Sequence, residues 1–192
     1  MSSSQAYKKG YFHIQDMASQ FTVNTLAPKP DERIADLCAA PGGKTFTIAE
    51  TMQNKGEVLA FDLYEKRCEL ISKGARRLGL DIIKTKTADA TVYNAELGLF
   101  DAVLCDVPCS GLGVIRRKPE IKYKDISDFS ELEQIQQKIL CNASNYVKNG
   151  GRILYSTCTL RRAENERQIE IFLDSHSEFV VKYERTFMPQ ND

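Results

Sequence analysis

Short apolar runs alternate with longer amphipathic stretches along most of this chain, and the alternation predicts its secondary structure. The apolar runs predict six strands, at residues 33–35, 57–62, 82–87, 100–105, 152–156 and 179–183. Apolar residues at helical spacing predict helices near residues 17–26, 46–50, 64–79, 129–147 and 162–175. Pro28 and Pro30 are expected to close the first of these helices, and Gly150 and Gly151 the fourth.

The order of these elements predicts the fold class. Strands that alternate with helices favour βαβ units, and hence a doubly wound, mostly parallel α/β sheet. A length of 192 residues suits one domain of this type. The first helix, with Met17, Phe21 and Leu26 on one face, is expected to flank the core. Ligands of such sheets bind beyond the carboxyl ends of the strands.

The segment from Asp36 to Thr45, Asp-Leu-Cys-Ala-Ala-Pro-Gly-Gly-Lys-Thr, joins the first predicted strand to a helix. Its glycines allow the backbone to approach a ligand, and the helix N-terminus offers unpaired N–H groups, as in a nucleotide-cofactor site. The segment matches neither the Gly-x-Gly-x-x-Gly fingerprint nor the Gly-x-x-x-x-Gly-Lys-Ser/Thr phosphate loop. On its own it therefore fits a structural turn as well as a cofactor site.

Acidic residues also follow the next strands. Asp62 lies 26 positions after Asp36, near the separation at which an acid after the second strand accepts from a ribose hydroxyl. Asp89 follows the third strand and could accept from an adenine amino group. A single acid usually caps a helix, but acids in register after three successive strands favour a binding site.

Composition narrows the classes of function. The chain has 26 basic and 26 acidic residues and no net charge, so contact with a polyanion would need a local patch. No apolar run is long enough to span a membrane and no signal peptide is recognisable, which predicts a soluble, cytoplasmic protein. Six cysteines without a CxxC pair, together with only His13 and His176, argue against a structural zinc site, so no metal is expected.

Two of the six cysteines fall at predicted strand ends. Cys109 and Cys158 lie just after the fourth and fifth strands, on turns where a thiol is exposed. A thiolate there could attack an electrophilic carbon, and basic neighbours such as residues 161–162 would lower its pKa. These features alone do not rank the two thiols. The other four cysteines are expected to pack as small apolar residues: Cys38, Cys68, Cys105 and Cys141.

Three motifs of this chain occur together in one known family. They are residues 36–45, the Asp-Val-Pro-Cys-Ser-Gly-Leu-Gly of residues 106–113, and the Ser-Thr-Cys-Thr of residues 156–159. Together they resemble the S-adenosylmethionine-dependent RNA cytosine-5 methyltransferases of the NOL1/NOP2/Sun class, and most of all its bacterial 16S rRNA members. Residues 10–19 also resemble the segment before that family's cofactor loop. The likeness runs over nearly the whole chain and implies a Rossmann-like class I methyltransferase fold.

The resemblance assigns roles to the two thiols and to Asp106. It makes Cys158 the nucleophile that adds to C6 of cytosine, so that C5 can accept a methyl group. It makes Cys109 the residue that assists release of the methylated RNA by elimination. Asp106 would contact the N3/N4 edge of the base and lie near the methionine part of the cofactor. The target cytosine would be single-stranded or flipped out, because C5 and C6 cannot be attacked inside a stack.

The resemblance also implies S-adenosylmethionine as the cofactor. Asp62 would bind its ribose and Asp89 its adenine, with Asp106 and Arg67 as further contacts. The loop residues of the implied cofactor site are Cys38, Ala39, Ala40, Pro41, Gly42, Gly43 and Lys44.

An RNA substrate, with rRNA first, would need positive charge near the cysteines. Residues 116–118 and 161–162 supply such charge and fit contacts with phosphates, although charged runs are often only solvated. Tyr123 and Phe129 are candidates for stacking on a base, with core packing as the alternative.

The family comparison also predicts the domain organisation. Residues 1–30 would form a flanking segment and helix, and residues 31–192 the catalytic domain. The chain would lack the N-terminal RNA-binding domain and the last strands of the rRNA enzymes.

Three other functions stay open at this point. The substrate could be a tRNA. An exocyclic amino-methyltransferase would carry an aromatic residue after an Asn/Asp-Pro-Pro motif, where this chain has Cys109. A non-catalytic RNA-binding scaffold is disfavoured because Asp106, Cys109 and Cys158 are all present.

Overall fold

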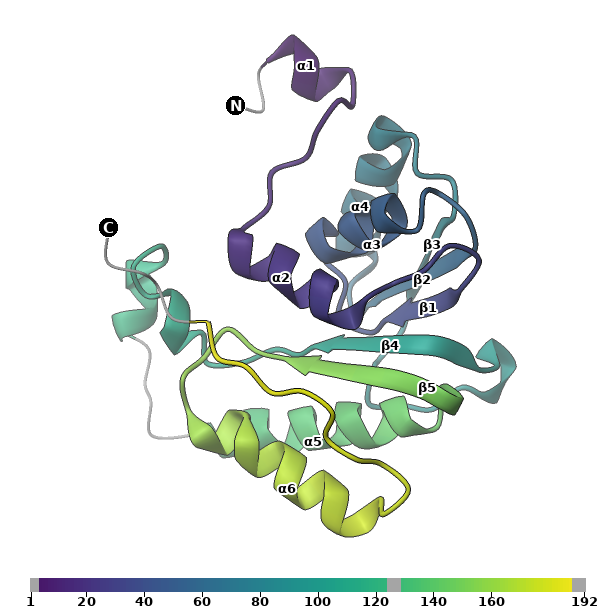
Figure 1. The fold of residues 1–192 in the computed structure, drawn as a ribbon. Helices are drawn as coiled ribbons and strands as arrows, with labels where there is room; N and C mark the ends of the chain where they lie inside the picture. The colour runs from purple at the N-terminus through teal and green to yellow at the C-terminus, as the bar shows by residue number, and fades with distance from the viewer. Residues whose placement is uncertain (1–3, 124–128, 188–192) are drawn as a thin grey trace.

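Five parallel strands form the centre of the fold, in the order β3-β2-β1-β4-β5 (Figure 1). This computed structural model describes residues 4–123 and 129–187. Because β1 pairs with both β2 and β4, the winding of the sheet reverses at β1, which is the position where such sheets bind ligands. The strands are β1 Arg33–Asp36, β2 Glu57–Asp62, β3 Ile83–Thr87, β4 Phe100–Asp106 and β5 Val147–Ser156.

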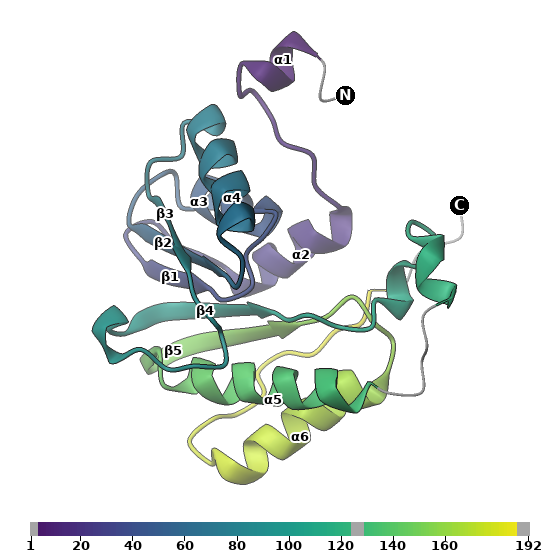
Figure 2. The same ribbon diagram turned by 180° about the vertical axis from the view of Figure 1, so that it is seen from behind.

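Helices cover both faces of this sheet. Figures 1 and 2 show α2, α3 and α4 on one face and α5 and α6 on the other. The α-helices are α1 Gln5–Lys8, α2 Met17–Leu26, α3 Gly43–Thr51, α4 Glu65–Leu78, α5 Ser130–Ser144 and α6 Glu166–Ser175. The short 3-10 helices are η1 Ala95–Leu97, η2 Leu112–Val114, η3 Pro119–Tyr123 and η4 Arg162–Glu164.

The strands contribute to two cores, one on each face. Ile34 packs in the core under α3 and α4, whereas its neighbour Ala35 packs in the core over α5. Successive side chains of a strand point to opposite faces, so a strand covered on both faces must be apolar at nearly every position. This explains the continuous apolar runs of the sequence.

Local signals set several helix ends. The Asp16 carboxylate accepts a hydrogen bond from the Ala18 N–H at 2.7 Å and caps the start of α2. Ala27, in the left-handed conformation just before Pro28, ends that helix. Gly79 ends α4 with a φ of 69°, a conformation that glycine adopts without strain.

The predicted doubly wound parallel sheet is confirmed, with five of its six strands. The sixth prediction, residues 179–183, is wrong: this segment forms no strand, and Val180 is 73% exposed. The fourth predicted helix ends early, at Ser144, and the end expected at Gly150 and Gly151 is also wrong. Both glycines lie inside β5, whose first residue Val147 pairs with Phe100.

The predicted apolar face of the first helix is partly wrong. Met17 and Phe21 are 69% and 39% exposed, and the buried residues of α2 are Val23 and Leu26. The division of the chain at residue 30 stays a prediction. Its outer ends, residues 1–3 and 188–192, lie outside the described residues.

Candidate active site

The carboxyl ends of β1, β2 and β4 place three acids at one edge of the sheet. Asp36, Asp62 and Asp106 are the last residues of these strands. Asp106 pairs in register with Ser156, the last residue of β5. The structure therefore brings the predicted acids of β1, β2 and β4 together with the loop that carries Cys158.

Asp36 lies under the glycine loop and is 1% exposed. The Thr45 hydroxyl donates to its Oδ2 at 2.7 Å, while Oδ1 is buried without a well-formed hydrogen bond from the described residues. Burial, reinforced by the nearby charge of Asp106, raises the pKa of Asp36 to about 7. This carboxyl is thus balanced between its neutral and ionised forms near neutral pH.

Gly42 makes the turn into α3. Its φ of 108° is open to glycine, and a Cβ at this position would lie 2.5 Å from the ring of Phe46. The helix begins at the next residue, Gly43, so its first N–H groups face the carboxyl edge of the sheet. The loop therefore presents a helix N-terminus beside the acids.

Asp62 braces this loop. Its Oδ2 accepts from the Ala40 N–H at 3.3 Å and its Oδ1 from the Tyr64 N–H at 3.2 Å. Arg67 lies 3.4 Å from Oδ1 and donates to the Ala40 carbonyl at 3.1 Å. A carboxylate has about four acceptor positions, so Asp62 keeps capacity for a hydroxyl donor.

Asp106 joins the glycine loop to β5. Lys44 Nζ donates to its Oδ2 at 2.6 Å, and the Ser156 hydroxyl donates to its Oδ1 at 2.7 Å. The Asp106 side chain is 31% exposed, so it remains accessible at the edge of the sheet.

Cys109 and Cys158 meet next to this pair, with their sulfur atoms 3.2 Å apart. A disulfide bond would be about 2.05 Å long, so both thiols are free. The hydrogen bond from the Cys109 thiol lowers the pKa of Cys158 to about 7, against the effect of burial, and Lys44 and Lys118 add to the lowering. The same bond raises the pKa of Cys109. Either thiol can donate to the other, and the Cys158 N–H also donates to the Cys109 sulfur at 3.2 Å. The opposite directions of the two pKa shifts favour Cys158 as the thiolate of the pair.

Gly113 allows the two cysteine loops to approach. Its N–H donates to the Cys158 carbonyl at 2.9 Å, and a Cβ on Gly113 would lie 2.9 Å from that same oxygen. Cβ atoms do not approach backbone oxygens so closely, so the motif requires a glycine at this position.

Asp89 follows β3 at the same edge of the sheet, and the N–H of its neighbour Ala88 donates to the Asp62 carbonyl at 3.0 Å. Oδ1 of Asp89 accepts from the N–H and the hydroxyl of Thr91, at 2.8 and 2.7 Å, and these bonds lower the pKa of Asp89. It also borders a cavity of about 30 Å³ together with Leu37 and Phe61. That volume suits a water molecule, so the predicted adenine contact of Asp89 stays a prediction.

The basic residues predicted to contact RNA differ in their ion pairs and in their exposure. Arg117 pairs with Asp16 at the start of α2, and Arg162 pairs with Glu170. Arg161 is held by Glu133 and by the buried Glu164. Residues 116 and 118 are exposed on the loop beyond Cys109. Of the two aromatic candidates, Tyr123 is 84% exposed, whereas Phe129 is buried under Arg161.

Comparison with known proteins identifies the family. The model of the family described as 16S rRNA methyltransferase RsmB/F matches residues 23–191. This chain belongs to the RsmB/F family. The family predicted from the sequence motifs is thus confirmed.

The "Probable ribosomal RNA small subunit methyltransferase B" of Bacillus subtilis is 46% identical over 90% of this chain and 39% of its own length. The ribosomal RNA small subunit methyltransferase B of Proteus mirabilis is 38% identical over 96% of this chain and 44% of its own length. The chain thus spans about two fifths of the length of these curated relatives.

A solved structure supports the fold as well as the family. The crystal structure of NSun6 from Pyrococcus horikoshii with SFG, an S-adenosylmethionine analogue, is 34% identical and superposes with a TM-score of 0.84. The match covers 91% of this chain and 45% of that one. The RsmB/F chain therefore has the Rossmann-like class I methyltransferase fold expected from the resemblance.

The RsmB/F family depends on S-adenosylmethionine, and the residues of this site fit that group. The helix N-terminus at Gly43 suits the carboxylate of its methionine part. Asp62, with acceptor capacity left, suits a ribose hydroxyl. A side chain at Gly42 would press against Phe46, so the loop can take its turn only with glycine there.

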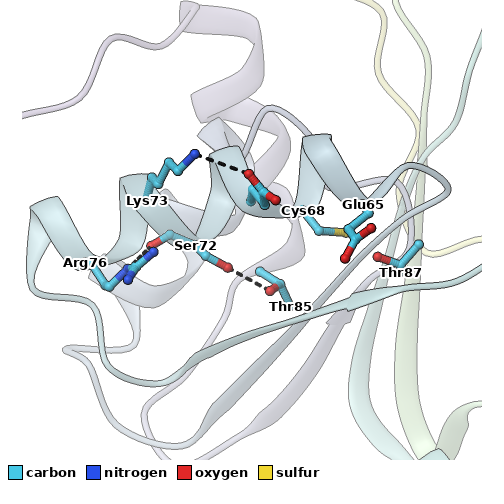
Figure 3. Close-up of a pocket in the computed structure, with 8 residues that line it drawn as sticks. Glu65, Cys68, Ser72, Lys73, Arg76, Thr85 and Thr87 are labelled. Carbon is cyan, nitrogen blue, oxygen red and sulfur yellow. Dashed lines mark hydrogen bonds and ion pairs between the residues drawn. The ribbon is translucent and has the colours of Figure 1, made fainter.

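A larger cavity of about 360 Å³ lies elsewhere, between α4 and β3 (Figure 3). Its lining includes the hydrogen-bonded Ser72 and Thr85 and the ion pair of Glu69 with Lys73. None of the described residues that line it belongs to the predicted RsmB/F site. This groove follows the outer edge of the sheet, and neither Cys109 nor Cys158 lines it.

Three buried polar residues behind the cysteines were not predicted from the sequence. Ser110, Gln136 and Glu164 are at most 1% exposed and form a hydrogen-bonded group under the two cysteine loops. Ser110 adjoins Cys109, but Gln136 and Glu164 come from α5 and η4. Their only sequence signal is that a charged and an amide residue stand at inward positions of helical segments.

No group of three or more histidine, cysteine or acidic residues in the described ranges could hold a metal ion. No helix within residues 4–123 or 129–187 is both long enough and apolar enough to span a bilayer. The expected cytoplasmic location stays a prediction.

Proposed function

We propose that this chain transfers a methyl group from S-adenosylmethionine to C5 of a cytosine in RNA, with 16S rRNA as the first candidate substrate. The observation that carries the proposal is the cysteine pair, 3.2 Å apart, beside Asp106 and Lys44 at the carboxyl edge of the sheet. Membership of the RsmB/F family and the names of the relatives support rRNA as the substrate.

Cys158 acts as the nucleophile. Its lowered pKa makes a substantial fraction thiolate at neutral pH, and the thiolate forms a bond to C6 of cytosine. The electron pair of the C5–C6 double bond then moves toward C5, which becomes nucleophilic. When bound, S-adenosylmethionine supplies the methyl group that C5 takes up.

Cys109 assists the release of product. Elimination transfers the C5 proton to solvent water, re-forms the C5–C6 double bond and expels the Cys158 sulfur as a thiolate. The Cys109 thiol, which already lies within hydrogen-bond distance of that sulfur, stabilises the departing thiolate. This role agrees with the raised pKa of Cys109, which keeps its proton in place.

Asp106 orients the cytosine base, and Lys44 neutralises the charge of the Asp106 carboxylate. With one oxygen held by Ser156 and the other by Lys44, the Asp106 carboxylate has a fixed position from which to accept from the amino group of cytosine. Residues 38–44, Asp62 and Arg67 would hold the cofactor, and Asp89 its adenine.

Covalent trapping tests this function. Cys109→Ala, incubated with S-adenosylmethionine and RNA, should accumulate a protein–RNA adduct that survives denaturing electrophoresis, because release is slowed more than addition. Cys158→Ala should form none, and Cys141→Ala, which changes a cysteine on α5, should behave as the parent protein. An adduct in the Cys158 variant would reverse the two roles.

The same assay separates the rival functions. Adduct with tRNA but not with 16S rRNA would identify the substrate as tRNA. RNA binding without any adduct or methylation would identify a non-catalytic scaffold, although the thiolate character of Cys158 argues against it.

A further inference from the structure

Glu164 is a buried carboxylate that the proposed chemistry does not use. It is 0% exposed and ends the short helix η4, which follows the Cys158 loop. A buried charge is unfavourable unless several donors surround it. The contacts of Glu164 therefore indicate its role in the structure.

Four donors point at this carboxylate. The Ser110 N–H donates to Oε2 at 2.8 Å and the Ser110 hydroxyl to Oε1 at 2.5 Å. Gln136 Nε2 donates to Oε2 at 3.0 Å, and Arg161 donates to Oε1 at 3.2 Å. Although burial alone would raise its pKa, these bonds hold the pKa of Glu164 below its ordinary value, so it remains ionised.

The residues that donate to Glu164 also contact both cysteine loops. Ser110 directly follows Cys109, and its hydroxyl lies 2.7 Å from the hydroxyl of Thr159, which directly follows Cys158. Gln136 also donates to the carbonyl of Pro108, at 2.9 Å. One carboxylate thus fixes the residues on both sides of Cys109 and, through Ser110, the residue after Cys158.

We propose that Glu164 is a positioning residue that holds the Cys109 and Cys158 loops together, so that the Cys109 thiol can donate to the Cys158 thiolate. Glu164 touches neither sulfur, and it acts through Ser110 and Thr159. The proposal builds on the proposed function, because it concerns how the nucleophile of that reaction is prepared.

The pH dependence of Cys158 alkylation tests this role. The rate of reaction with iodoacetamide follows the thiolate fraction, and mass spectrometry of the Cys158 peptide reports this cysteine alone. In the parent protein the midpoint should lie near pH 7. In Glu164→Gln it should rise by about one pH unit toward the ordinary cysteine value, which lowers the rate at pH 7 about fivefold.

The direction of the shift separates positioning from simple electrostatics. Removing a nearby negative charge, with no other change, would favour the thiolate and lower the midpoint. If Glu164 only stabilised the fold, its replacement would lower the melting temperature and leave the midpoint of Cys158 alkylation unchanged. Loss of the Cys109–Cys158 contact instead raises the midpoint.

Two further variants complete the design. Glu170→Gln makes the same charge change on the outer side of α6, where Glu170 pairs with Arg162 and Arg167, and should leave the midpoint at the parent value. Ser110→Ala keeps the carboxylate but removes the hydroxyl that links it to Thr159, and should raise the midpoint by a smaller amount. It also provides the test if Glu164→Gln fails to fold.

An unchanged or lowered midpoint in Glu164→Gln, or in Ser110→Ala where the first variant does not fold, would overturn the proposal. The assay needs neither RNA nor cofactor. If the midpoint rises in Glu164→Gln but the parent protein methylates no RNA, the role of Glu164 is upheld and the proposed function is contradicted.

Discussion

Replacement of Asp36 by asparagine should change how the stability of this protein depends on pH. The ordinary pKa of an aspartate is 3.8, whereas burial raises that of Asp36 to about 7. Between these two values the folded protein binds more protons than the unfolded chain. The free energy of unfolding therefore falls as the pH rises from about 4 to about 7.

The size of the effect follows from the difference of about three pH units. Each unit corresponds to about 1.36 kcal/mol, so ionisation of Asp36 lowers the free energy of unfolding by about 4 kcal/mol above pH 7. About 2.5 kcal/mol of this change falls between pH 5 and pH 8. Asp36→Asn cannot ionise, and its amide oxygen can still accept from Thr45.

Urea unfolding at pH 5 and pH 8 measures the difference. The stability of Asp36→Asn relative to the parent should improve by about 2.5 kcal/mol from the lower to the higher pH. Asp101→Asn is the matched control, because the hydrogen bond from Lys148 holds the pKa of Asp101 below its ordinary value and the carboxyl is ionised throughout this range. A difference between Asp36→Asn and the parent that is the same at both pH values would refute the reasoning.

Three more variants test the site. Asp62→Ala should weaken S-adenosylmethionine binding about tenfold or more by calorimetry, through loss of a hydrogen bond to a charged acceptor; equal affinity would exclude the ribose contact. Gly113→Ala should slow alkylation of Cys158 at pH 7, because its Cβ would push on the Cys158 carbonyl, and a parent-like rate would contradict this. Arg117→Ala should reduce the slope of log RNA affinity against log salt concentration by about one. Equal slopes for Arg117→Ala and the parent would show that Arg117 serves only its pair with Asp16.

The sequence predicted those parts of the fold whose signals are local. The apolar runs of β1 to β4 and the acids that end three of them depend on neighbouring residues, and they lie where the pattern indicated. The start of β5 was not predictable in this way. Val147 stands four residues after Ala143, which is helical spacing, yet pairing with Phe100 draws it into the sheet.

The prediction for residues 179–183 failed for a related reason. An apolar run such as Phe-Val-Val at residues 179–181 suits a strand, but a strand also needs a partner for its backbone. In the part of the chain that the structure describes, no strand pairs with this segment, and Val181 is 52% exposed. Sequence pattern alone does not show whether such a partner exists.

In the candidate site, too, the residues in local motifs were predictable and those defined by distant contacts were not. The motifs located both cysteines, but the bare residues could not rank them, because the ranking depends on a contact between positions 49 residues apart and on the charges of Lys44 and Lys118. Glu164 was missed because its partner Ser110 lies 54 positions away. A glutamate at the start of a helix ordinarily indicates only a favourable helix dipole.

The place of β3 at the outside of the sheet affects how copies of this protein meet. Its outer edge pairs with no other strand among the described residues, so its N–H and C=O groups could recruit an extended segment of another molecule. Lys84, with a side chain 68% exposed, and Lys86 belong to this strand. Lys84 also pairs with Glu57, and lysines on an edge strand disfavour the pairing of two such edges.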